Sequence, residues 1–201
     1  MSHPRPKQGN GRFTYDDYLH WPDDERWELI DGVAYDRSPA PSRRHQDFVV
    51  ELTVQTVNHV RGGNCLTYVA PFDVRLPRAD EADALVDSVV QPDVAVICDP
   101  AKLDDKGCRG APDWIVEILS PGTARKDHRE KRDLYERHGV REYWLLHPID
   151  GVLMIYRLVN DGYGKPDVVP LTGETVVTAI DGLIIRWPGA EPSASSDTAS
   201  P

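Results

Sequence analysis

Cysteine is scarce in this sequence, and no cysteine motif is present. The three cysteines, Cys65, Cys98 and Cys108, are an odd number and form no CxxC pair, which argues against a disulfide framework and against a zinc knuckle. We therefore expect buried or incidental cysteines. Long hydrophobic runs are also missing: no stretch reaches the length of a membrane span, and the N-terminus lacks the apolar core of a signal peptide. A soluble cytoplasmic protein is the expectation.

Positive charge is in deficit as well. The formal net charge is -10 at pH 7, whereas a protein that depends on non-specific DNA affinity is normally basic, because neutralised phosphates supply that affinity. The deficit argues against a pure DNA-binding module, and less against an enzyme whose own site needs carboxylates. The Walker A loop, the GxSxG elbow, the GxGxxG loop and the HExxH motif are also absent, which removes the signatures of several other catalytic classes.

The chain length of 201 residues suits one domain. Residues 1–12 are polar and predict a flexible N-terminal arm. Residues 190–201 lack core-forming side chains and predict a disordered tail. Because no repeat or linker divides residues 13–189, we expect one folded domain there.

The pattern between these ends predicts a mixed α/β fold. A β-hairpin is expected around Asp31-Gly32, a strong turn signal within "RWELIDGVAYDR". Helices are expected at 42–60 and 124–138, strands at 65–76, 91–98, 113–119, 141–147, 152–158 and 182–187, a short helix or turn at 14–19, and irregular acidic loops at 77–90 and 99–110. This order favours a central mixed sheet flanked by helices over a doubly wound parallel sheet. The crossover after 113–119 is long enough to make that strand parallel to 141–147.

A carboxylate interrupts the apolar run from Trp114 to Leu119. A charge in such a strand costs several kcal/mol unless it is paired or bound to a metal. Glu117 could lie at the strand end, in water or beside an arginine; alternatively it could share a metal with Asp93, which precedes a second apolar strand. Paired strands are about 4.8 Å apart, so the two carboxylates could hold one ion. Asp93 could equally be a turn or cap residue after proline.

The helix at 124–138 places a lysine on its inner face. Helical spacing puts Asp127 and Lys131 on the same side as the apolar Leu134 and Tyr135. The strand climbs about 10 Å from Glu117 to Ser120. If the helix packs back antiparallel to the strand, it descends about 10 Å from Ala124 to Lys131, which then arrives near Glu117. Asp, Glu and Lys are the combination that metal-dependent phosphodiester hydrolysis uses. A structural salt bridge would give the same arrangement.

At these residues the chain resembles the PD-(D/E)XK nuclease superfamily, and more closely the Uma-type family of bacterial restriction-endonuclease-like proteins. The resemblance covers about residues 13–187 and is carried by "WELIDGVAY", "SPAPSRRHQ", "QPDVAVI", "PDWIVEILSPGTARKDHREKRDLYERHGVREYWLLHP" and "YRL". It implies that Asp93 and Glu117 are the catalytic, metal-binding carboxylates. The usual lysine position holds Leu119, and the resemblance implies that Lys131 on the following helix substitutes for it. Lys126, nearer the helix start and off the inner stripe, is the weaker candidate.

Further residues are accessory candidates. His45 matches a histidine common in the family, although a lone histidine on an apolar helix face is more often a hydrogen-bonded core residue. Glu28 could be another metal ligand or a partner for Arg26. Backbone N–H groups from Ser120 to Thr123 could meet a phosphate. Arg125 and Arg129, with Lys126 and Arg132, could hold a DNA backbone, although a solvated helix face is the commoner explanation.

The expected function is Mg²⁺-dependent endonucleolytic cleavage of DNA, with Mn²⁺ as a substitute. The competing hypothesis is a nuclease-fold protein without turnover that binds DNA or a protein partner, and a third is a nuclease acting on RNA or on mobile-element intermediates. Symmetric cleavage of both strands would require a homodimer, which rests on analogy between folds.

Overall fold

The computed structural model describes residues 12–22, 26–36, 40–120 and 126–187. Apart from Arg12, the predicted arm 1–12 lies outside these residues, and so does the predicted tail 190–201. Within the described ranges, no helix combines the length and the apolar character that crossing a membrane requires.

The centre of the fold is a mixed six-stranded sheet with the order β12-β11-β10-β9-β6-β3. Its strands are β3 (Leu66–Val69), β6 (Val94–Ile97), β9 (Trp114–Ile118), β10 (Glu142–His147), β11 (Val152–Arg157) and β12 (Asp167–Pro170). β9 and β10 are parallel, as predicted, and the other neighbours in this sheet are antiparallel. The predicted mixed α/β class is confirmed.

The apolar run of β9 is covered on both faces. Ile115 packs into one core cluster together with Leu134 and Tyr135, whereas Trp114 and Val116 pack into a second cluster on the opposite face. This alternation is the two-residue period of a strand buried on both sides.

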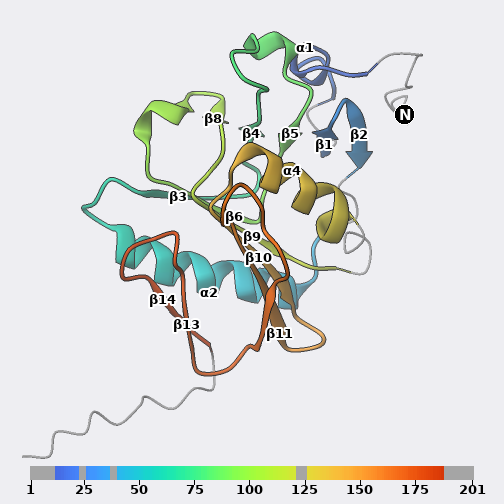
Figure 1. The fold of residues 1–201 in the computed structure, drawn as a ribbon. Coiled ribbons are helices and arrows are strands. Elements are labelled where there is room, and N and C mark those ends of the chain that lie inside the picture. Colours follow the sequence, from blue (N-terminus) through green and yellow to red (C-terminus); the bar gives the residue numbers. More distant parts are fainter. Residues whose placement is uncertain (1–11, 23–25, 37–39, 121–125, 188–201) are drawn as a thin grey trace, which may run out of the picture.

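One helix covers each face of the central sheet. α2 (Arg43–Val60) is capped at its N-terminus by Ser42, whose side chain accepts a hydrogen bond from the backbone N–H of His45 at 3.2 Å. Leu52 of α2 belongs to the second cluster. The other helix has a π-helical first part, η3 (Asp127–Lys131), followed by α4 (Arg132–His138), and it ends at Gly139 in the left-handed conformation. Figure 1 shows β6, β9 and β10 between α4 and α2.

A second six-stranded sheet was not predicted. The hairpin of β1 (Trp27–Ile30) and β2 (Val33–Asp36) has the expected register around Asp31-Gly32. It continues through β5 (Val89–Val90), β4 (Val74–Arg75), β8 (Gly107–Arg109) and β7 (Leu103–Asp104). The expected single strand at 65–76 is therefore wrong, since β3 and β4 belong to different sheets. The expected irregular loops 77–90 and 99–110 contain β5, β7, β8 and two short 3₁₀ helices, η1 (Asp83–Leu85) and η2 (Pro100–Lys102).

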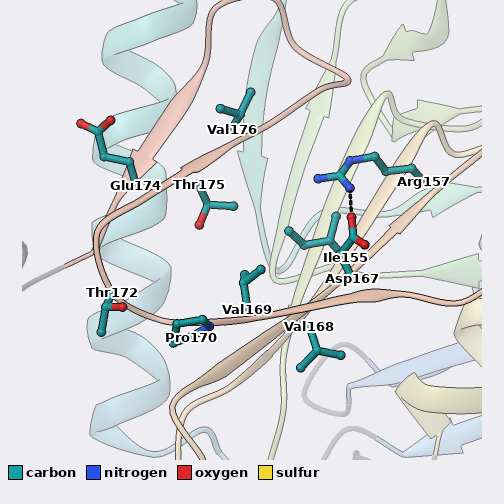
Figure 2. Close-up of a pocket in the computed structure, with 10 residues that line it drawn as sticks. All are labelled: Ile155, Arg157, Asp167, Val168, Val169, Pro170, Thr172, Glu174, Thr175 and Val176. Atoms are coloured by element: carbon teal, nitrogen blue, oxygen red, sulfur yellow. Dashed lines mark hydrogen bonds and ion pairs between the residues drawn. The ribbon is translucent and has the colours of Figure 1, made fainter.

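Smaller elements complete the domain. α1 (Tyr15–Tyr18) occupies the predicted short helix, and β14 (Ile184–Arg186) lies in the predicted last strand. β14 pairs with β13 (Glu174–Val176), which was not predicted. A cavity of about 420 Å³ lies between this hairpin and the strands β11 and β12 (Figure 2). It holds the Arg157–Asp167 ion pair and none of the predicted site residues.

A disulfide joins Cys65 and Cys98, which corrects the expectation of incidental cysteines. The two residues are 33 positions apart, so no short spacing motif marks them. The antiparallel pairing of Leu66 with Ile97 brings them together, because the next pair in that register is Cys65 and Cys98. Cys108 is a buried free thiol.

Candidate active site

Two carboxylates meet on neighbouring strands of the central sheet. β6 and β9 are antiparallel with Val94 opposite Val116, so Asp93 and Glu117 are the next pair in register. They share the sheet face with Ala95 and Ile115, which pack against the η3–α4 helix. Both side chains are buried, with 5% of Asp93 and 2% of Glu117 exposed. The two acids therefore lie side by side.

Lys131 reaches this pair from the helix. Its Nζ donates to Glu117 Oε1 at 2.6 Å and lies 2.7 Å from Glu28 Oε1, and the residue is only 1% exposed. The predicted inward direction of Lys131 and its proximity to Glu117 are both observed. A buried lysine is tolerated here because the carboxylates around it balance its charge.

Lys126 also lies in the site, which corrects its placement off the inner stripe. Its Nζ is 2.5 Å from Glu28 Oε2. The cause is the π-helical turn Asp127–Lys131, in which backbone hydrogen bonds join residues five apart rather than four. This wider turn brings Lys126 to the same side as Lys131, whereas α-helical spacing places it elsewhere.

Glu28 connects the second sheet to both lysines. It lies on β1, is fully buried, and accepts a hydrogen bond from the backbone N–H of Gln91 at 2.9 Å through Oε1. Its two oxygens thus orient Lys126 and Lys131. The sequence suggested Arg26 or a metal as its partner; the two lysines were not foreseen, because they are about a hundred residues away in the chain.

Two further groups in the site were not predicted. Tyr135 Oη donates to Glu117 Oε1 at 2.9 Å, and Asp127 Oδ1 lies 3.8 Å from Lys131 Nζ. The sequence did contain a signal for both, because helical spacing places them on the same inner face as Lys131.

His45 contacts the site from the first turn of α2. Its Nε2 lies 3.0 Å from Asp93 Oδ2, and the backbone N–H of Ile118 donates to that same oxygen at 2.8 Å. Both descriptions of His45 apply, because it is a buried, hydrogen-bonded residue of the helix and its partner is Asp93. The histidine and the strand backbone together fix the orientation of the Asp93 carboxylate.

Burial governs the electrostatics of the site. It raises the pKa of Glu117 to about 8, although Lys131 acts to lower it, and the neighbouring acids Asp127 and Asp93 raise it further. Burial and the adjacent Glu117 also raise the pKa of Tyr135 well above its usual value, so Tyr135 remains a hydrogen-bond donor. The site thus holds a carboxyl group whose pKa is raised by its surroundings, and such shifts are typical of functional sites.

Most of these groups line a cavity of about 790 Å³, which we call the site cavity. Asp93, Glu117, Lys126 and Lys131 form its polar end together with His45, Ser120 and Asp127. The exposed apolar residues Val50 and Val54 of α2, with Val69 of β3, line another part. The cavity as a whole is large enough to admit a phosphate group and solvent.

The predicted nucleic-acid contacts divide into three groups. Ser120 lines the site cavity. Arg129 is exposed on the helix. Thr123 and Arg125 lie outside the described residues.

The residues fit a Mg²⁺ ion with few protein ligands. Among the described residues, no group of three or more His, Cys, Asp and Glu side chains has an arrangement that could hold a metal. Mg²⁺ does not need such a cage, because it commonly binds one or two carboxylates and completes its shell with water and substrate phosphate. Lys131 and Tyr135 both donate to Oε1 of Glu117, which leaves Oε2 for another ligand. Asp93 and Glu117 offer the hard oxygen donors that this ion prefers.

Known proteins are similar to this chain, two of the matches by sequence and one by structure. The model of the family described as "Uma2: Putative restriction endonuclease" matches residues 15–186. A protein of Synechocystis sp. described as "Uncharacterized protein slr1290" is 27% identical over 154 residues, covering 75% of this chain and 77% of that protein. The crystal structure of "a putative nuclease belonging to DUF820" from Anabaena variabilis has a TM-score of 0.65 at 20% identity, covering 82% of this chain and 89% of that chain.

Proposed function

The chain belongs to the Uma2 family, described as "Putative restriction endonuclease", and from this premise we propose that it is a Mg²⁺-dependent endonuclease that hydrolyses phosphodiester bonds of DNA. The observation that carries the proposal is the meeting of Asp93, Glu117 and Lys131 at one end of a cavity. A buried salt bridge alone would not need a second carboxylate beside it, nor a cavity in front of it.

Asp93 and Glu117 would hold the metal. When bound, Mg²⁺ would neutralise charge on the phosphoryl group and favour deprotonation of the attacking water. His45 and the backbone N–H of Ile118 hold the Asp93 carboxylate in place. Tyr135 does the same for Glu117.

Lys131 would act on the scissile phosphate. Its Nζ is held between Glu117 and Glu28, so little reorganisation is needed when charge develops on the phosphoryl oxygens. The amine would orient the attacking water or stabilise that charge, and it would fill the role of the lysine that Leu119 replaces. Lys126, held by the other oxygen of Glu28, adds a second positive charge at the same end.

The decisive experiment is a cleavage assay on supercoiled plasmid, single-stranded DNA and RNA with Mg²⁺ or Mn²⁺. We expect metal-dependent cleavage of DNA that chelation abolishes and that Asp93→Asn and Glu117→Gln remove. Lys165→Met, which alters an exposed lysine, is the matched control and should cleave like the wild type. Metal-independent cleavage, or cleavage that survives both site substitutions, would contradict the proposal.

One observation favours a second candidate, a nuclease-fold protein that binds DNA or a protein partner without turnover. The usual lysine position holds the apolar Leu119. Calorimetric titration with Mn²⁺ separates the two candidates. Binding that disappears in Asp93→Ala supports the enzyme, whereas DNA binding without any metal binding supports the second candidate.

A further inference from the structure

A second polar cavity adjoins the site cavity. It has a volume of about 500 Å³, and we call it the Asp73 cavity; its lining is Tyr68, Phe72, Asp73, Gln91 and residues 104–107 of the β7–β8 hairpin, together with Pro71. Val69 and Ala70, which lie between Tyr68 and Pro71 in the chain, line the site cavity and not the Asp73 cavity. One short segment of chain therefore separates the two cavities. A ligand that occupies one cavity therefore lies close to the other.

Two aromatic rings line the Asp73 cavity. Tyr68 and Phe72 stack on each other with ring centroids 4.1 Å apart and an interplanar angle of 9°. Both side chains are only partly buried. Parallel, accessible rings are the surface on which nucleobases stack in proteins that bind unpaired strands.

Asp73 supplies a fixed acceptor in the same cavity. Its Oδ1 accepts hydrogen bonds from Tyr18 Oη at 3.0 Å and from Gln91 Nε2 at 2.8 Å. No described residue donates to Oδ2, so the carboxylate is oriented through one oxygen and can accept from a ligand through the other. Among the lining charges, Asp104 is paired with Arg75, and Lys106 stands against the two acids Asp73 and Asp105. The lining thus keeps a net negative charge, which disfavours a phosphate here and favours a group that presents N–H donors.

Gln91 links the Asp73 cavity to the catalytic groups. While its side chain contacts Asp73, its backbone N–H donates to Glu28 Oε1, which also contacts Lys131. Gln91 is two residues before Asp93, a span of at most about 7 Å in extended chain. The cavity is therefore placed to receive a group next to the phosphate that would be cleaved.

We propose that the Asp73 cavity binds an unpaired nucleobase of the substrate that carries an exocyclic amino group. The base would stack on the Tyr68–Phe72 pair, and its amino group would donate to Asp73 Oδ2, as amino groups of bases do to acidic side chains elsewhere. Cytosine, adenine and guanine carry such a group; uracil and thymine do not. The proposal rests on the proposed function in that it names the base beside the cleaved bond, and it makes Asp73 a specificity-determining residue.

The first test uses cytidine and uridine, which differ at the position that Asp73 would contact. Their affinities for the full-length protein are measured by calorimetry or NMR titration, without metal and without cleavage. We expect cytidine to bind about five- to tenfold more tightly, as for one hydrogen bond. Equal affinities would overturn the proposal.

Asp73→Asn sharpens the test. The asparagine oxygen can still accept from Tyr18 and Gln91, which turns its amide N–H groups toward the ligand. The preference should then reverse, because O4 of uridine is an acceptor. Asp105→Asn removes the same charge from the same cavity and should change the preference for cytidine far less than Asp73→Asn does, because Asp105 is not the proposed hydrogen-bond partner of the amino group. If Asp105→Asn changes the preference as much as Asp73→Asn does, only general charge is involved and the proposal fails.

Phe72→Leu provides an independent variant that retains an apolar side chain. It should weaken binding of both nucleosides, because stacking does not depend on the amino group; unchanged affinity would contradict the proposal. The outcomes also separate this proposal from the endonuclease. If the protein discriminates between the nucleosides but does not cleave DNA, the proposed base site stands and the proposed endonuclease activity is refuted. If it cleaves DNA but does not discriminate, the endonuclease activity stands and the base site is refuted.

Discussion

Glu117 and Glu142 lie on the neighbouring parallel strands β9 and β10, and both are almost completely buried. Glu142 accepts hydrogen bonds from Trp144 Nε1 at 2.6 Å, Thr178 Oγ1 at 2.5 Å and the backbone N–H of Ala179 at 2.9 Å, with Arg157 Nε 3.8 Å away. Glu117 instead pairs with a buried lysine, adjoins a second acid and lines the site cavity.

The difference between these glutamates teaches what burial of a carboxylate does and does not indicate. Glu142 ties the segment around Ala179 to the sheet through neutral donors on both of its oxygens, which is a structural role. Both described donors to Glu117 use one oxygen, and its charge depends on a lysine. Burial is common to both, so the signal of function is the donor set and the access to a cavity.

The largest expected effect separates the two glutamates by activity. If the proposed function holds, Glu117→Gln should lower the cleavage rate by about a thousandfold or more, because a metal ligand is lost. Glu142→Gln should retain activity within a few-fold at a temperature where it is folded. Initial rates on plasmid DNA with saturating Mg²⁺ measure both. Equal losses of activity in the two variants would show that Glu117 has no role in cleavage that Glu142 lacks.

The second prediction concerns the lysines that distinguish the Glu117 environment. Lys131→Met should lower cleavage by about a hundredfold to a thousandfold. It should still fold, because methionine retains the packed stem and Glu117 can take up a proton. It should also still bind metal through Asp93 and Glu117, because the metal displaces that proton. Lys126→Met should cost about tenfold or less, since Lys126 contacts only Glu28 among these acids. Full activity in Lys131→Met would end the catalytic assignment of that residue.

The third prediction reverses the order of the glutamates when stability is measured. Glu142→Gln should lower the free energy of unfolding by about 1–3 kcal/mol, because both oxygens accept hydrogen bonds and an amide N–H₂ must face one of the donors. At pH 8, Glu117→Gln should cost less than about 1 kcal/mol, since its amide oxygen can accept from Lys131 and Tyr135 while the N–H₂ faces the cavity. Urea unfolding of both variants checks the order.

Sequence patterns were sufficient where a short period controls position. The apolar run placed Glu117 in a buried strand, and helical spacing directed Lys131 toward it. The positions of these two residues were therefore predictable, whereas their roles in catalysis remain predictions. The prediction placed Lys126 away from the inner face because it used α-helical spacing, whereas the helix begins with a π-helical turn.

Long-range pairing was beyond the reach of those patterns. Glu28 meets its lysines, and Cys65 meets Cys98, only through tertiary contacts between distant segments. The second sheet was missed because β4, β5 and β7 are two residues long and show no periodicity. The fold class survived these omissions because the longest elements define the central sheet.

The last prediction concerns the pH dependence of stability. Burial raises the pKa of Glu117 to about 8 in the folded protein, against a usual value of 4.5. Between these values the folded state holds a proton that the unfolded state has released, so unfolding becomes easier as pH rises through this window. The slope is at most about 1.4 kcal/mol per pH unit. The raised pKa already includes the opposing effect of Lys131.

Glu117→Gln removes this titration and leaves that of the other groups. The free energy of unfolding of the wild type, minus that of Glu117→Gln, should therefore fall between about pH 5 and pH 8 and become constant above that range. Urea titrations at pH 5, 6, 7 and 8 measure the difference. Glu142→Gln, compared with the wild type in the same way, is the control for a buried glutamate without a lysine partner. If the difference for Glu117 rises with pH instead, the carboxylate is stabilised in its charged form, and the salt bridge with Lys131 outweighs burial.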